Sequence, residues 1–225
     1  MQEYKTYFDH IHMIFEAEHQ ANTYLLDAGV QQILIDAGAL EARLEGLNRN
    51  RLQSIYLTHG HYDHITHLKE WKETRGLKAY IHSDDQIMLT NPMLNMSVMN
   101  GCPMRGLPAD GFIKDGEIIN LSPVWQLQVV ATPGHTKGSC CFLLWKKLTN
   151  NSPEPVALFT GDTLLGGKLG RTDFPGGVPP LMSGTVERLK ALMYALPESV
   201  AMFFGHGRPS TVGIERKFNP FLRKD

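Results

Sequence analysis

The sequence predicts an α+β fold in which two mixed β-sheets pack together and carry helices on their outer sides. Three observations support this prediction. Short β-rich segments open the chain, strands and helices alternate in its middle, and more strands and a long amphipathic segment close it. A chain of 225 residues buries roughly 70% of the surface that its unfolded form exposes, which suffices for one sizeable core. We therefore expect a single domain over residues 1–225.

The first third of the chain supplies one series of elements. Its predicted strands are a loosely alternating run at residues 7–15 and β-rich runs at 22–26, 32–36 and 54–57. Leu40, Leu44 and Leu47 have helical spacing, so residues 39–47 are predicted to form an amphipathic helix. Residues 64–73 also have a helical pattern.

The remainder of the chain is predicted to contain a strand and a helix, a long loop, and then further strands and a long helix. Residues 78–81 predict a strand and 84–89 a helix, whereas 90–116 are interrupted by proline, glycine and asparagine and predict a long functional loop. Further strands are predicted at 116–121, 127–131, 140–145, 156–159 and 200–204. Residues 181–196 predict a long amphipathic helix.

Composition excludes several classes of protein. The net charge is −1 and charges of both signs are dispersed, so neither nucleic acid nor an anionic membrane is expected as a partner. No apolar run approaches the roughly 20 residues that a membrane helix needs, and the first ten residues do not resemble a secretory signal. The three cysteines, Cys102, Cys140 and Cys141, are expected in the core, since an odd number with an adjacent pair argues against a disulfide framework. We therefore expect a cytoplasmic protein.

Four residues that commonly bind metals follow the predicted strand at 54–57. They are His59, His61, Asp63 and His64. Because side chains alternate along extended backbone, the first three are expected to project to one side, while His64 enters the next helix.

Three later segments share a second layout, in which an apolar strand leads through a small-residue turn to one such side chain. These side chains are His135, Asp162 and His206. Strand ends are rigid supports, and the neighbouring glycines let the backbone approach an ion closely. One buried histidine commonly just hydrogen-bonds a carbonyl, but four converging segments predict a metal site. Imidazole and carboxylate groups suit zinc and iron.

The order of these residues resembles the metallo-β-lactamase superfamily, whose pattern is H-x-H-x-D-H followed by a distant His, Asp and His. The resemblance covers residues from about 20 to 210 and implies an αββα sandwich. It implies that His59, His61 and His135 hold one divalent metal ion and that Asp63, His64 and His206 hold another. Asp162 would bridge the two ions, which we expect to be zinc, with iron or manganese as alternatives.

The implied chemistry is hydrolysis. Two metal ions about 3.5–4 Å apart hold a hydroxide between them and polarise a substrate carbonyl. Asp63 has a second expected role, which is to orient that hydroxide as a catalytic residue.

Two segments resemble a narrower group, the short bacterial glyoxalase II-like proteins. The segment 161–177 contains Asp162 followed by a G-R-T-D-F-P run, and the segment 205–221 contains G-H-G and then E-R-x-x-N-P-F, with Arg208 inserted before the proline. This resemblance implies hydrolysis of an acyl-glutathione thioester, of which lactoylglutathione is the type substrate.

Substrate recognition must differ from that of full-length glyoxalase II enzymes, whose C-terminal helical domain supplies basic residues for glutathione. This chain ends 19 residues after His206. The candidates for binding an anionic substrate are Lys168, Arg171 and Arg208. An alternative for Arg171 is an internal salt bridge with Asp173.

Two other functions fit parts of the pattern. A mononuclear-iron glutathione persulfide dioxygenase would use two histidines and one aspartate, and that branch also carries G-R-T-D-F. A non-catalytic metal-stabilised module is the second alternative. The remaining histidines, His10, His12, His19, His67 and His82, are expected to be structural or to support the ligands, and Met88, Met93, Met96 and Met99 either to line a substrate wall or to pack under the loop.

Overall fold

The computed structural model describes residues 4–14, 20–148 and 152–223. The chain folds into two compact units, Met1–Ile113 and Lys114–Asp225, each with its own β-sheet. His19 and Phe15 lie outside the described residues. Among the described residues, no helix is both long enough and apolar enough to cross a membrane.

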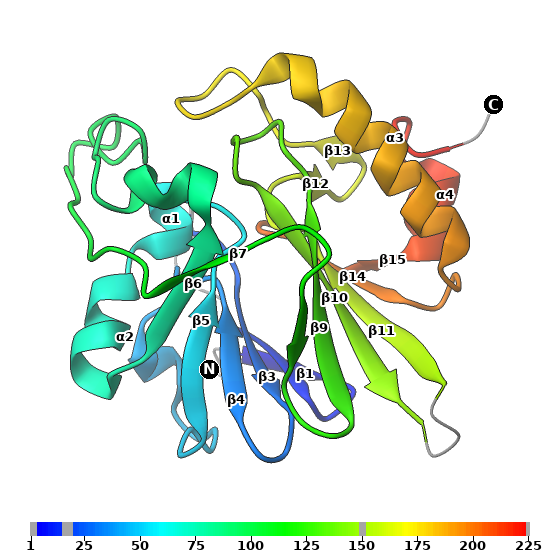
Figure 1. Ribbon diagram of the computed structural model, residues 1–225, viewed down its shortest axis with the longest axis horizontal. Coiled ribbons are helices and arrows are strands. Elements are labelled where there is room, and N and C mark those ends of the chain that lie inside the picture. The colour runs from blue at the N-terminus through cyan, green and yellow to red at the C-terminus, as the bar shows by residue number, and fades with distance from the viewer. Residues whose placement is uncertain (1–3, 15–19, 149–151, 224–225) are drawn as a thin grey trace. The chain divides into compact units, whose positions relative to one another are not determined.

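The first unit contains a seven-stranded mixed sheet whose strand order follows the chain (Figure 1). Its strands are β1 Tyr4–Tyr7, β2 Ile11–Ile14, β3 Thr23–Asp27, β4 Gln32–Ile35, β5 Leu52–Tyr56, β6 Lys78–His82 and β7 Gly111–Ile113. Strands β1 to β4 pair antiparallel, and β4 to β7 pair parallel. The carboxyl ends of β4 and β5 therefore meet at one edge of the sheet.

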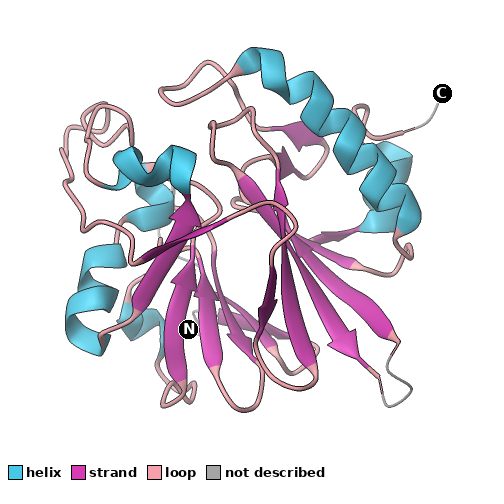
Figure 2. Ribbon diagram, viewed as in Figure 1, coloured by secondary structure: helices cyan, strands magenta, loops and turns pink. Residues whose placement is uncertain are grey.

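Helical segments of the first unit are short (Figure 2). They are the 3₁₀-helices η1 Glu41–Leu44 and η2 Ser83–Leu89 and the α-helices α1 Tyr62–Ile65 and α2 Leu68–Arg75. The amphipathic helix predicted at 39–47 is wrong in length and type, since Glu45 has a non-helical ψ of 134° and Gly46 has φ +86°. The helix predicted at 64–73 is divided, because the His67 amide bonds to the Ala37 carbonyl instead of continuing the helix.

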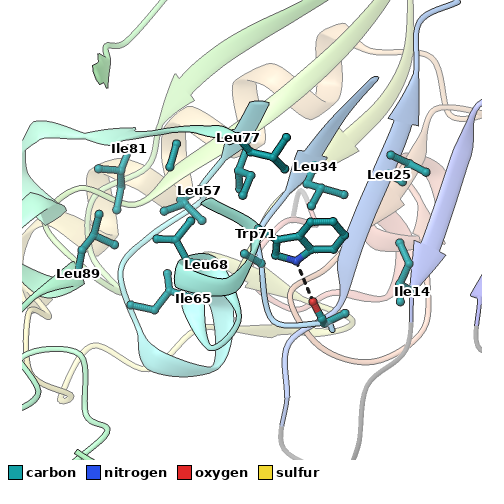
Figure 3. Close-up of a cluster of buried hydrophobic side chains, with 14 of the residues drawn as sticks. Ile14, Leu25, Leu34, Leu57, Ile65, Leu68, Trp71, Leu77, Ile81 and Leu89 are labelled. Carbon is teal, nitrogen blue, oxygen red and sulfur yellow. Dashed lines mark hydrogen bonds between the residues drawn. The ribbon is translucent and has the colours of Figure 1, made fainter. Parts of the chain in front are cut away.

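Trp71 anchors the core of the first unit. Its ring is 1% exposed, and its indole Nε1 donates to the Ala39 carbonyl at 3.0 Å (Figure 3). Leu34 from β4, Leu57 after β5 and Ile81 from β6 belong to the same cluster. Burial of such side chains contributes about 1.5–3 kcal/mol each, and it fixes β4 and β5.

The second unit contains a six-stranded mixed sheet and a two-stranded hairpin. The strands are β8 Ile118–Asn120, β9 Trp125–Ala131, β10 Cys140–Lys147, β11 Pro153–Phe159, β14 Ala201–Phe203 and β15 Ser210–Thr211, and the hairpin is β12 Leu164–Leu165 with β13 Lys168–Leu169. Strand β11 pairs parallel to β14 and antiparallel to β10, which is antiparallel to β9. Strands β9, β11 and β14 therefore run in the same direction and end at the same edge.

Two helices complete the second unit, α3 Pro179–Ala195 and α4 Val212–Phe218. Leu189 and Met193 of α3 are fully buried beside Met202 of β14. The Arg216 guanidinium donates to the carbonyls of Met193 and Leu196, which satisfies the C-terminal end of α3.

The predicted fold class is confirmed, since the chain is α+β with two mixed sheets and flanking helices. From residue 22 onward the predicted strands correspond to observed strands within a few residues. The strand predicted at 7–15 instead covers the turn at residues 8–10 and strand β2, and its last residue lies outside the described residues. Strands β1, β7, β12, β13 and β15 and helix α4 were not predicted. The prediction that all cysteines are buried is wrong for Cys102, which is exposed in the long loop, while Cys140 and Cys141 are buried free thiols.

Candidate metal centre

The first unit gathers four of the predicted ligands at the carboxyl end of β5. His59 and His61 lie in the irregular segment after the strand, and Asp63 and His64 lie in α1. The expectation that Asp63 continues an extended segment is wrong, because the helix begins at Tyr62 with His61 as its N-cap. All three histidines are buried, being at most 3% exposed.

The imidazoles of this group are close together. The ring centroid of His59 lies 4.8 Å from that of His61 and 4.1 Å from that of His64. The Nε2 atom of His64 lies 3.9 Å from Oδ2 of Asp63, which is longer than a hydrogen bond. Each of these three pairs offers ligand atoms within 4.8 Å of one another.

Asp36, directly after β4, hydrogen-bonds to this group of ligands. Its carboxylate is 1% exposed, and Oδ2 lies 2.8 Å from Nδ1 of His64. It also accepts hydrogen bonds from the amide and the hydroxyl of Thr58, and the Thr58 hydroxyl lies 3.1 Å from Nδ1 of His59. Since Nδ1 of His64 is engaged with a carboxylate, its Nε2 is left to face a metal ion, as in carboxylate–histidine–metal arrangements.

The second unit places one predicted ligand beyond each of three parallel strands. His135 follows β9, Asp162 follows β11 and His206 follows β14. Oδ2 of Asp162 lies 3.8 Å from Nε2 of His135 and 3.4 Å from Nε2 of His206. The Asp162 carboxylate therefore lies between two imidazoles, which is the position that a bridging ligand needs.

The G-R-T-D-F segment supports two of these side chains through its backbone. Nδ1 of His135 donates to the Arg171 carbonyl at 2.7 Å, which leaves Nε2 for a metal ion. A Cβ atom on Gly170 would lie 1.8 Å from the Asp162 carbonyl oxygen and 3.1 Å from Nδ1 of His135. Only glycine fits at this position.

These donor sets fit divalent metal ions. Metal–nitrogen bonds of about 2.0–2.1 Å in a tetrahedral site place neighbouring ligand atoms about 3.4 Å apart. The distances of 3.4 Å, 3.8 Å and 3.9 Å within the two units are close to this value. Burial raises the pKa of the Cys141 thiol to about 11, so this buried thiol stays protonated near neutral pH.

The three candidate substrate residues lie elsewhere in the second unit. Lys168 is exposed in β13, and Arg208 is exposed just after His206. The Arg171 side chain is exposed, pairs with Asp173 at 2.6 Å and lies over the Phe174 ring at 4.0 Å. The guanidinium holds the pKa of the Asp173 carboxyl at about 2, so the pair is intact at neutral pH.

Sequence reasoning missed Asp36, Thr58 and the backbone role of Gly170. The sequence marks Asp36 only as the last residue of a predicted strand run. In the structure its backbone has φ +60°, which is uncommon for a residue other than glycine. His82, predicted to be structural, caps η2 by accepting from the Asp84 amide. His67 lies 3.3 Å from the Glu70 carboxylate.

The chain belongs to the metallo-β-lactamase superfamily, whose family model matches residues 17–206. That match spans all seven predicted ligands and both compact units. Members of this superfamily bind divalent metal ions, and the resemblance drawn from the ligand pattern is confirmed.

Relatives from several bacteria match nearly the whole chain. An uncharacterized protein of Mycobacterium tuberculosis is 35% identical over 214 residues, covering 89% of this chain and 92% of its own. A probable metallo-hydrolase of Bacillus subtilis is 32% identical, covering 90% and 92%. The hydroxyacylglutathione hydrolase GloC of Haemophilus influenzae is 29% identical, covering 91% and 89%.

Solved structures agree with this assignment. The B3 metallo-β-lactamase BLEG-1 is 29% identical, with a TM-score of 0.77 over 94% of this chain and 99% of its own. A protein crystallised in a di-iron-bound form is 28% identical, with a TM-score of 0.73 over 93% and 99%. ETHE1 from Myxococcus xanthus is 25% identical, with a TM-score of 0.67 over 93% and 83%.

Proposed function

We propose that this metallo-hydrolase superfamily member cleaves acyl-glutathione thioesters of the lactoylglutathione type and that it uses two divalent metal ions. The single observation that carries the proposal is the orientation of the ligands. In each unit an acceptor, the buried Asp36 carboxylate or the Arg171 carbonyl, engages Nδ1 of a histidine whose Nε2 lies near a carboxylate.

The proposal requires residues 1–225 to act as one metallo-β-lactamase domain, in which both units contribute ligands. His59, His61 and His135 would hold one ion, Asp63, His64 and His206 the other, and Asp162 would bridge them. Support comes from the family model, which matches a continuous stretch containing all seven residues. Zinc is the proposed metal, and iron is the alternative, since one similar protein was crystallised with two iron ions.

Bound metal ions would supply Lewis acidity and a water that ionises near neutral pH. The protein residues would do the rest. The Asp63 carboxylate, whose side chain is 13% exposed, would orient the attacking water by accepting its hydrogen bond. The Asp36 carboxylate would hold His64 in the tautomer that has its proton on Nδ1.

The substrate class is proposed from the similarity to GloC, whose name states the activity, and from the basic residues of the second unit. A glutathione thioester carries two carboxylates, and Lys168 and Arg208 are exposed cations near the ligands in the sequence. Arg171 is the third candidate, although its guanidinium is already paired with Asp173.

The Arg171 pairing gives a testable pair of variants. Arg171→Met should raise KM for lactoylglutathione more than it lowers kcat if the guanidinium contacts the substrate equally in the ground and transition states. Asp173→Asn removes the competing carboxylate and should then lower KM. The pKa of the Asp173 carboxyl is lowered to about 2 by Arg171, so the ion pair persists below the ordinary pKa of a carboxyl and is lost only as the pH falls through about 2. An unchanged KM in both variants would assign Arg171 to the loop alone.

Steady-state hydrolysis of lactoylglutathione tests the activity itself. The zinc-loaded protein should release glutathione, and Asp162→Ala should abolish the reaction because both ions lose a ligand. His67→Ala is the matched control, since that histidine follows the same motif but lies beside Glu70, and it should keep the parent rate. Negligible thioester hydrolysis by metal-loaded parent protein would contradict the proposal.

A further inference from the structure

The short helix η2 lies directly against the backbone between His59 and His61. The Gly60 amide donates to Oδ2 of Asp85 at 3.1 Å. A Cβ atom on Gly60 would lie only 2.5 Å from Cβ of Met88 and 3.3 Å from the Asp85 carbonyl oxygen. The H-G-H segment therefore rests on η2 with no room for a side chain.

Asp85 is an unusual residue for this place. Its neighbours Asp84 and Gln86 are exposed, whereas Asp85 is 1% exposed, and carboxylates are rarely buried without a specific role. A buried carboxylate that accepts from a backbone amide forms a charge-assisted hydrogen bond, which is stronger than a neutral one.

Helix η2 is itself held in place. His82 caps its first turn, and the Asn95 side-chain amide, which is fully buried, donates to the carbonyls of Met88 and Met104. The Asn95 carbonyl accepts from the Tyr62 amide at 2.8 Å, on the other side of His61. Helix η2, which supports the H-G-H segment, is therefore held by hydrogen bonds at both of its ends.

We propose that Asp85 is a positioning residue for the metal centre, which sets the backbone between His59 and His61 through its hydrogen bond to Gly60. This inference rests on the proposed metal binding but not on the identity of the substrate. Asp36 accepts from the Thr58 amide and Asp85 from the Gly60 amide, so two buried carboxylates from different elements hold the ligand segment.

Zinc affinity of the metal-free protein, measured by competition with a chromophoric chelator, tests this role. Asp85→Ala should weaken zinc binding by about 10–100-fold, the usual effect of removing a group that orients ligands. Asp84→Ala, an adjacent exposed carboxylate, should leave the affinity unchanged. Asp85→Asn keeps an oxygen that accepts from the Gly60 amide and should restore most of the affinity, which a purely electrostatic role would not allow.

Two further readouts separate positioning from folding. Thermal unfolding of each metal-free variant identifies any that does not fold, and the cobalt-substituted absorption spectrum should change in Asp85→Ala and not in Asp84→Ala. If Asp85→Ala does not fold, Asp85→Glu decides, because the longer side chain should displace Gly60 and weaken zinc binding. Parent-like affinity and spectrum in a folded Asp85→Ala or Asp85→Glu variant would overturn the inference. A parent protein that binds no zinc would instead contradict the proposed function.

Discussion

Asp36 is linked to two members of the first unit's ligand cluster. It contacts His64 directly and reaches His59 through the Thr58 hydroxyl. Its backbone has φ +60°, a conformation that asparagine also adopts readily.

Asp36→Asn should therefore fold with little backbone strain but bind zinc more weakly. The amide cannot fix the His64 proton as a carboxylate does, and the expected loss of affinity is about 10–100-fold. Chelator competition measures it, with Asp27→Asn as the control, since that residue binds Arg51 and Gln32 away from the ligands. Equal zinc affinity in Asp36→Asn and the parent would show that the carboxylate does not orient the ligands.

The residues expected to bind metal could be selected from the sequence because each has a local signature. His135, Asp162 and His206 each follow an apolar run and stand beside glycine or threonine. Asp36 and Asp85 each contact a residue more than 20 positions away in the sequence. Gly170 approaches Asp162 across the β12–β13 hairpin. Such contacts depend on tertiary packing and leave no periodic pattern to read.

At the scale of elements, the segment after β11 acts as a support for the second unit's ligands. The β12–β13 hairpin returns the chain so that Gly170 meets the Asp162 carbonyl. Glu215 of α4, which is 4% exposed, accepts from the Gly167 amide and from the Asn219 side chain. The E-R-x-x-N-P-F terminus therefore stabilises the hairpin and the end of α3.

Gly170→Ala tests this support. Its Cβ would overlap a backbone oxygen, which no rotamer change relieves, and the expected cost is about 1–3 kcal/mol or more together with loss of bound metal. Gly184→Ala is the matched control, since nothing lies within 4 Å of its Cβ position in the exposed face of α3. Thermal unfolding should show stabilisation of about 0.5–1 kcal/mol for that variant. Equal stability and metal content in the two variants would refute the supporting role.

Strands were predicted more accurately than helices, and the reason is physical. Leu44 and Leu47 have helical spacing, and both pack against the core of the first unit. Only a short 3₁₀-helix forms there, since the backbone of Gly46 is left-handed with φ +86°. The missed elements are short and owe their conformation to neighbours, as in α4, where the Thr211 hydroxyl caps the Ile214 amide. The hydrophobic pattern of the sequence predicts long buried strands, whereas the conformation of elements of two to seven residues depends on tertiary contacts.

At the scale of the whole molecule, the two mixed sheets of the superfamily were predictable because buried strands dominate both halves of the sequence. The division into two compact units was not predicted. Four of the proposed ligands belong to one unit and three to the other. Metal binding should therefore stabilise the folded chain by mass action.

The number of metal ions per chain tests the central claim most directly. Elemental analysis of protein purified without added metal should give about two divalent ions, falling to about one in His206→Ala, with thioester hydrolysis lost in that variant. The persulfide dioxygenase alternative predicts a different metal content, because His64 and His206 would not be ligands. One iron ion per chain, unchanged in His206→Ala, together with oxygen consumption on glutathione persulfide and no thioester hydrolysis, would contradict the account.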